Sequence, residues 1–288
     1  NRWLTNGWWC GCGGSVSQGT VILLFQPAEE IGNGARRMMA EGALEGVEAI
    51  FTAHVSHEHP AGVVGSRPGP LLAGCGFFRA VIGRKNGRPG NPHRYADPIL
   101  AASAAVISLQ GIVSRESNPL DSQVVSVTIF NDGGNGVGTT PDTVVIGGTF
   151  RAFSNASFYR LLRRIEQVIV EQTRVYRCSG AVDFFDEKTA LYPPTVNDER
   201  MYGYVRSAAT ELMGAANFRV VAPAMGAEDF SFYSQAVPAA FYYVGIANEA
   251  RGWVHSAHSP FFMIDEDALP VGAATHAAIA ERYLNDNG

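Results

Sequence analysis

The chain has 288 residues, which is long enough for one large domain or for two domains with a sizeable core. Its composition, with 46% hydrophobic and 17% charged residues, is that of an ordinary globular protein, and the formal net charge of -5 gives no electrostatic reason to expect a nucleic acid or an anionic membrane as a partner. Four cysteines are too few for a disulfide framework, and no run approaches the roughly 18 consecutive apolar residues of a membrane span.

The first predicted element is a buried strand at residues 21–25, where the sequence reads VILLF. The sequence opens close to this strand and without an initiator methionine, so we expect either a fragment of a longer protein or an error in the gene model. Pro27, Glu29 and Glu30 follow the strand directly. Paired carboxylates at the carboxyl end of a strand can share metal ligation and proton transfer. The alternative is that they balance the dipole at the start of a helix.

The next predicted elements are a short helix at 35–44 and a second buried strand at 47–55. His54 ends this second strand, so a second element delivers a metal-competent side chain near its end. The sequence that follows is rich in glycine and proline, which marks a domain boundary near residues 65–75.

Residues 76–186 have a different order of predicted elements, β-α-β-β-α-β. This is the ferredoxin-like unit, one four-stranded sheet with two helices on one face. The predicted strands are 77–82, 123–130, 144–153 and 181–185, and the predicted helices run from 97 to 113 and from 158 to 169.

After a linker at 189–200, stiffened by two prolines, the sequence returns to an α/β pattern. It predicts helices at 201–213 and 268–284, a strand at 239–246, and loops at 226–230 and 255–260. We therefore predict an α/β protein whose outer domain, residues 1–74 and 188–288, has a mainly parallel sheet. An inserted ferredoxin-like domain at 75–187 interrupts it.

Four metal-competent side chains lie at predicted strand ends or loops of the outer domain: Glu29, Glu30, His54 and His258. A hydrolytic metal site needs imidazole and carboxylate groups from several strand ends, with a position left open for water. Each residue alone is weak evidence, because a lone histidine is more often a surface or core side chain. Four on one edge of a sheet favour a metal site.

Ordered sequence blocks identify a family. They are FQPAEE at 25–30, AHV at 53–55, GSRPGPLLA at 65–73, DPILAAS at 97–103, PLDSQVVSVT at 119–128, IGGTFRAFS at 146–154, YPPTVN at 192–197, MGAEDFSFY at 225–233 and HSPFF at 258–262. This pattern resembles the plant indole-3-acetic acid (auxin)–amino acid conjugate hydrolases, within the aminoacylase and carboxypeptidase-like metallohydrolases. The resemblance implies a catalytic α/β domain with a bimetal site, interrupted by a lid or dimerisation domain.

The resemblance also implies roles for the candidate residues. Glu29 is the general base, and Glu30, His54 and His258 are metal ligands, with Mn²⁺ as the expected ion and Zn²⁺ as the alternative. The Glu228-Asp229 pair lies in a matching block near the substrate cleft, and Glu228 is the residue of the pair that is expected to bind substrate. The implied substrate is an N-acyl amino acid, and the implied partner is a second copy of the chain, bound through the lid.

The chain departs from the family pattern at two places. The family has a Cys-Gly-His-Asp segment that supplies two further metal ligands. This chain has only Cys10-Gly11-Cys12, which lies too close to Glu29 in the sequence to correspond to that segment. Half of the ligands of the two-metal site are therefore expected to be missing. In the lid, the family's Gly-Gly-His-Ala turn is replaced by Asn86-Gly87-Arg88-Pro89. Arg88 can donate to an oxyanion but cannot copy a neutral imidazole. His93 matches a nearby family histidine that lines the substrate pocket.

These departures leave alternatives open. One is a catalytically inactive, truncated paralogue that acts as a binding or interaction protein, and another is an aminoacylase or peptidase of different specificity. Family members reach the endoplasmic reticulum with an N-terminal signal and a C-terminal retention tail; this sequence shows neither, so its compartment stays open.

Overall fold

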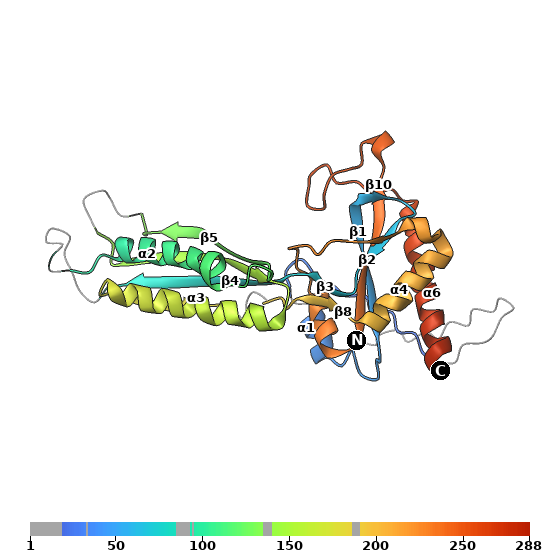
Figure 1. The fold of residues 1–288 in the computed structure, drawn as a ribbon, viewed down its shortest axis with the longest axis horizontal. Helices are drawn as coiled ribbons and strands as arrows, with labels where there is room; N and C mark the ends of the chain where they lie inside the picture. Colours follow the sequence, from blue (N-terminus) through green and yellow to red (C-terminus); the bar gives the residue numbers. More distant parts are fainter. Residues whose placement is uncertain (1–18, 33, 85–92, 94, 135–139, 186–190) are drawn as a thin grey trace.

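A computed structural model describes most of the chain as an elongated molecule with a group of elements at each end (Figure 1). The described residues are 19–32, 34–84, 93, 95–134, 140–185 and 191–288. Residues 74–183, with strands β4 to β7 and helices α2 and α3, form one end, and the remaining elements form the other, where the C-terminus lies (Figure 1).

A four-stranded mixed sheet organises the end of the molecule that holds the candidate site. Its order is β1-β10-β2-β9, and the strands are β1 (Ile50–Pro60), β2 (Val64–Ser66), β9 (Phe218–Val220) and β10 (Ala239–Ala247). The β1–β10 and β2–β9 pairs are parallel, whereas β10 and β2 run antiparallel. The mixed α/β class is therefore as predicted, with parallel pairs in the majority.

Strand β10 is buried on both faces, which explains its continuous apolar sequence AAFYYVGIA. Because successive side chains point to opposite faces, Tyr242 and Ile246 pack on one side and Phe241 on the other. The first side is covered by α4 (Glu199–Met213) and α6 (Ala268–Asn287). The second is covered by α1 (Gly34–Ala40) and α5 (Phe230–Ala236).

A separate antiparallel sheet, with order β5-β6-β4-β7, forms the other end. Its elements follow the predicted β-α-β-β-α-β sequence: β4 (Gly74–Gly83), α2 (Pro98–Gly111), β5 (Gln123–Asn131), β6 (Thr143–Ala152), α3 (Asn155–Val175) and β7 (Ser179–Asp183). Both helices share one hydrophobic core with this sheet, including Leu109 of α2 and Phe158 of α3. Asp97 caps α2 by accepting hydrogen bonds from the amides of Ile99 and Leu100.

Helix α2 and the π-helical turn after it, residues Pro98–Glu116, form 19 residues with a mean hydropathy of 1.4. By length and composition alone, this stretch is apolar enough to cross a membrane. In the structure, however, Ala101, Ala105 and Leu109 are fully buried against the antiparallel sheet. One face of this stretch therefore belongs to the hydrophobic core at this end of the molecule.

The predicted linker contributes a strand. β8 (Thr195–Asn197) pairs with β3 (Gly69–Leu72), and the buried Asn197 joins three strands. Its Nδ2 donates to the carbonyls of Arg67 and Phe241, and its Oδ1 accepts from the Phe241 amide at 2.7 Å. This segment is therefore fixed to the sheet by backbone and side-chain hydrogen bonds.

Three predictions near the N-terminus are wrong. Residues 21–25 form no strand, and Leu23 and Phe25 are 59% and 75% exposed, because no described strand pairs with this segment. Helix α1 ends at Ala40, followed by turns with Gly42 at a φ of +87°. Strand β1 begins at Ile50 and continues to Pro60, so His54 lies inside the strand and not at its end.

Candidate metal site

The Glu29–Glu30 pair lies on a tight turn between Pro27 and α1. Ala28 adopts a left-handed conformation with φ +61°, and the amide of Gly32 donates to the Glu29 carbonyl at 2.7 Å. A left-handed alanine costs about 1–2 kcal/mol, and such strain is typical of functional sites. The turn removes the alternation of a regular strand, so both carboxylates can serve one site.

Glu228 and Asp229, just before α5, face this turn. Carboxylate oxygens of Glu29, Glu228 and Asp229 all lie within 4.8 Å of one another. Burial raises the pKa of Glu228 to about 9, and a hydrogen bond with Glu29 and the charges of Glu29, Asp229 and Glu30 add to the shift. The site therefore concentrates negative charge and holds a proton on one carboxyl at neutral pH.

His54 reaches the same carboxylates from the middle of β1. Its Nδ1 lies 2.7 Å from the Val55 carbonyl, which can only accept, so the proton of the neutral ring is on Nδ1. The Nε2 lone pair is then directed to the site, 3.6 Å from Glu228 Oε1. A backbone carbonyl that fixes the tautomer in this way is typical of metal-binding histidines.

Glu30 and His258 form the open side of the site. His258 Nε2 lies 3.2 Å from Glu30 Oε1, and both side chains are about three-quarters exposed (74% and 73%). An exposed pair of this kind contributes about 0–1 kcal/mol, so stability does not explain it. His258 also has a left-handed backbone with φ +68°. The pairing therefore fits a ligand site better than a structural ion pair.

The residues fit a divalent metal. Two imidazole nitrogens and several carboxylate oxygens are the donors that Mn²⁺ and Zn²⁺ accept. A cation would also offset the charges of Glu29, Asp229 and Glu30, which add to the effect of burial on the pKa of Glu228. Pairwise contacts connect the predicted residues, with Glu30 against His258, His54 against Glu228, and Glu228 hydrogen-bonded to Glu29. Among the described residues, the carboxylates within ligating distance of one another are Glu29, Glu228 and Asp229, and this group does not include the predicted ligands Glu30, His54 and His258.

Of the other two predicted site residues, Arg88 lies outside the described residues. His93 is exposed and follows the far end of β4, whose ten residues carry the chain about 30 Å from Gly74. A role for either residue in substrate binding stays a prediction.

The site also contains residues that the sequence predictions missed. Asp229 is 1% exposed and accepts hydrogen bonds from the side chain of Gln26. Burial raises the pKa of the Tyr192 hydroxyl to about 12, with Glu29 and Asp229 among the neighbouring charges, so this phenol also lies at the carboxylates. The blocks YPPTVN and MGAEDFSFY contain both residues, but neither block reveals their spatial neighbours.

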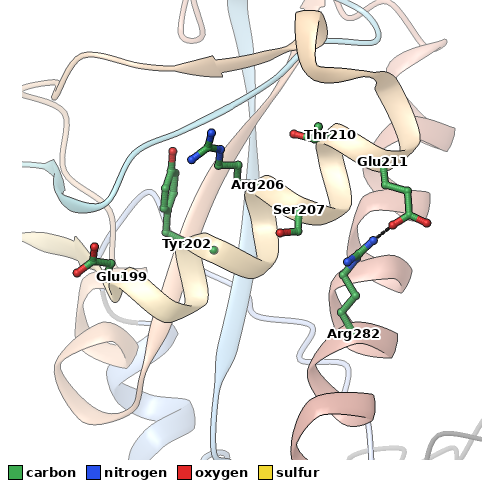
Figure 2. A pocket seen from close by; sticks show the side chains of 8 residues that line it. Glu199, Tyr202, Arg206, Ser207, Thr210, Glu211 and Arg282 are labelled. Carbon is green, nitrogen blue, oxygen red and sulfur yellow. Dashed lines mark ion pairs between the residues drawn. The ribbon is translucent and has the colours of Figure 1, made fainter.

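A surface depression of about 600 Å³ lies elsewhere, between α4 and α6, where Arg282 of α6 pairs with Glu211 of α4 (Figure 2). It shares no residue with the carboxylate–histidine cluster, so it is not part of the candidate site.

The mixed α/β sheet with its neighbouring glutamates and histidines is an arrangement that metal-dependent hydrolases share. Comparison with protein families agrees: residues 14–282 match the model of peptidase family M20/M25/M40. The chain belongs to this family.

Two named relatives are similar to this chain over most of its length. The chain is 61% identical over 269 residues to the IAA-amino acid hydrolase ILR1-like 6 of Arabidopsis thaliana, a match that covers 93% of this chain and 57% of that protein. It is 35% identical to the N-acetyl-L-cysteine deacetylase of Bacillus subtilis, over 94% of this chain and 62% of that protein. The chain thus spans about three-fifths of the length of these relatives.

Solved structures share the fold. A Staphylococcus aureus protein described as an aminohydrolase matches with a TM-score of 0.83 and 30% identity, over 90% of this chain and 65% of that one. A dinuclear metal binding peptidase of family M20 from Bacillus subtilis matches with a TM-score of 0.74 and 29% identity, over 91% of this chain and 64% of that one.

Proposed function

We propose that the chain carries the hydrolytic site of a metal-dependent amidohydrolase that cleaves N-acyl amino acids, with indole-3-acetyl amino acids as the leading substrates. The observation that carries the proposal is the approach of the Glu29–Glu30 turn to Glu228, with Glu30 against His258 and His54 against Glu228. The 61% identity to an IAA-amino acid hydrolase supports the substrate class.

The chain's own residues divide the chemistry. Glu30, His54 and His258 would hold a divalent ion, which supplies Lewis acidity to the amide carbonyl and to water. Glu29 takes a proton from the attacking water and delivers it to the leaving amine nitrogen. Glu228 shares a hydrogen bond with Glu29, which orients the base.

We propose Mn²⁺ as the ion, with Zn²⁺ as the alternative, since imidazole nitrogens and carboxylate oxygens are donors that both ions accept.

We also propose that residues 75–187 form an inserted lid and that 1–74 and 188–288 form the catalytic domain. A second copy of the chain is the expected partner. Strand β5 supports this, because it is an edge of the antiparallel sheet, with Ile129 and Phe130 each 47% exposed. An unpaired edge with apolar side chains is a surface on which another strand can add.

The test is hydrolysis of an indole-3-acetyl amino acid by the purified chain with added Mn²⁺, measured as free amino acid released. We expect Glu29→Gln to lower kcat by about 100-fold or more, because general-base catalysis contributes about that much. Glu41→Gln, an exposed glutamate in the turn after α1, is the matched control. A folded wild-type chain without Glu29-dependent turnover would contradict the proposal and favour the inactive paralogue.

A further inference from the structure

Asp229 stands at the start of helix α5, where an aspartate ordinarily accepts hydrogen bonds from the first amides of its own helix. In this structure its side chain makes no such bond. The carboxylate is 1% exposed and is directed at a segment about 200 residues earlier in the chain. Something other than capping of α5 therefore accounts for this buried charge.

The partners of Asp229 flank the Glu29–Glu30 turn. On one side, Gln26 Nε2 donates to Oδ1 at 2.8 Å and to Oδ2 at 2.7 Å. On the other side, the amide of Ala35 donates to Oδ2 at 3.0 Å, and the amide of Gly34 also bonds to the carboxylate. One side chain thus ties together the residue before the turn and the residues after it.

The turn has one backbone hydrogen bond of its own, from the Gly32 amide to the Glu29 carbonyl, and it contains a left-handed alanine and an exposed Glu30, so contacts from outside add to what holds it. Helix α1 has only seven residues, so it depends on outside contacts for its stability. Tyr233 of α5 contacts Met38 of α1, so the two helices also pack together. The hydrogen bonds of Asp229 are therefore the polar contacts that determine the position of the turn relative to helices α1 and α5.

We propose that Asp229 is a positioning residue for catalysis: its carboxylate clamps both ends of the Gln26–Ala35 segment and so holds the base Glu29 and the ligand Glu30 in register with His54 and His258. The catalytic part of this inference rests on the proposed function, whereas the clamp itself does not. Catalytic groups must be held to a fraction of an ångström, so loss of the clamp is expected to lower kcat more than it raises KM.

The clamp is tested first without catalysis, by hydrogen–deuterium exchange of the amides in 26–40. We expect Asp229→Ala to speed exchange of Ala35 and its α1 neighbours about tenfold or more, with a smaller effect for Gln26→Ala. The matched control is Asp121→Ala in the antiparallel unit, where Asp121 likewise accepts from a glutamine, Gln123 Nε2, at 2.7 Å. Unchanged exchange in Asp229→Ala would overturn the proposal.

Asp229→Asn separates positioning from charge. Asparagine keeps one oxygen for the Ala35 amide, and Gln26 can turn its amide over to accept from the new Nδ2. We expect this variant to keep exchange rates and Mn²⁺ affinity within about threefold of the wild type. If exchange is normal but Mn²⁺ affinity falls in Asp229→Asn as far as in Glu30→Ala, Asp229 is a ligand and the proposal is wrong.

Where the wild type hydrolyses a conjugate, kinetics complete the test. We expect kcat to fall about tenfold or more in Asp229→Ala with KM within about threefold, and Asp229→Asn to restore most of kcat. Equal losses of kcat in both variants would overturn the positioning role. If the wild type shows no turnover, the proposed function fails, but exchange and Mn²⁺ affinity still decide whether Asp229 is the clamp. Thermal melts identify any variant that fails to fold. If Asp229→Ala does not fold, the same measurements on Gln26→Ala and Asp229→Asn test the proposal.

Discussion

The raised pKa of Glu228 predicts how the metal-free protein responds to pH. The pKa of this carboxyl rises from 4.5 to about 9 in the folded chain, so the folded state keeps a proton that the unfolded state releases. Between these two values the stability falls as pH rises, because unfolding then releases a proton. The contribution of Glu228 is fully present below about pH 4.5 and is lost as pH approaches 9.

The size of the effect follows from the linkage relation. Each pH unit in this window changes the free energy of unfolding by up to about 1.4 kcal/mol. The Glu228 side chain is 16% exposed, so solvent screens it little. From pH 6 to pH 8 we expect a loss of about 2–3 kcal/mol, or about 5–10 °C in Tm.

The assay is thermal melting in a chelator at pH 6, 7 and 8, for the wild type and Glu228→Gln. Glutamine can still donate to Glu29 but does not titrate. The Tm of Glu228→Gln should therefore fall less as pH rises than the Tm of the wild type. The difference between the two pH dependences is the contribution of Glu228. Mn²⁺ competes with the proton, so it should raise Tm more at pH 8 than at pH 6. Equal pH dependence in the two proteins would refute the reasoning.

Three further predictions concern packing and surface. Asn197→Ala leaves the buried Phe241 amide without its acceptor and should lower the free energy of unfolding by about 2–4 kcal/mol in a urea melt; a loss under about 1 kcal/mol would contradict this. Phe130→Lys should convert a dimer to a monomer by light scattering, whereas Tyr159→Lys on α3 should not; a wild-type monomer would rule out the lid interface. Phe25→Asp should reduce aggregation and binding of a hydrophobic dye while changing stability by less than about 0.5 kcal/mol, since Phe25 is 75% exposed; unchanged aggregation would show that another surface is responsible.

The antiparallel unit was predictable because its signals are local and long. The apolar positions Phe158, Leu161 and Ile165 repeat at helical spacing and are all buried in α3. Asp97 followed by proline marks the start of α2, where the structure has its cap. Long periodic elements carry enough residues for the pattern to decide their type.

Other elements carried no such signal. Strands β2, β8 and β9 have three residues each, too few for any periodicity, and exist because neighbouring strands pair with them. The opposite error occurred at 21–25, where an apolar run predicts burial but no described strand or helix covers Phe25. Burial requires a partner surface, and a single sequence does not state which surface is present.

The same distinction between residues with and without a local sequence signal applies to the candidate site. Glu29, Glu30, His54 and His258 could be proposed from the sequence because their chemistry is visible in their residue types and positions. Asp229 could not, because the rule for an aspartate before a helix predicts a cap of that helix. Its actual partners, Gln26 and Ala35, are 203 and 194 residues away. A residue that acts by holding others has no signature of its own, and its role follows only from the donors that the fold places around it.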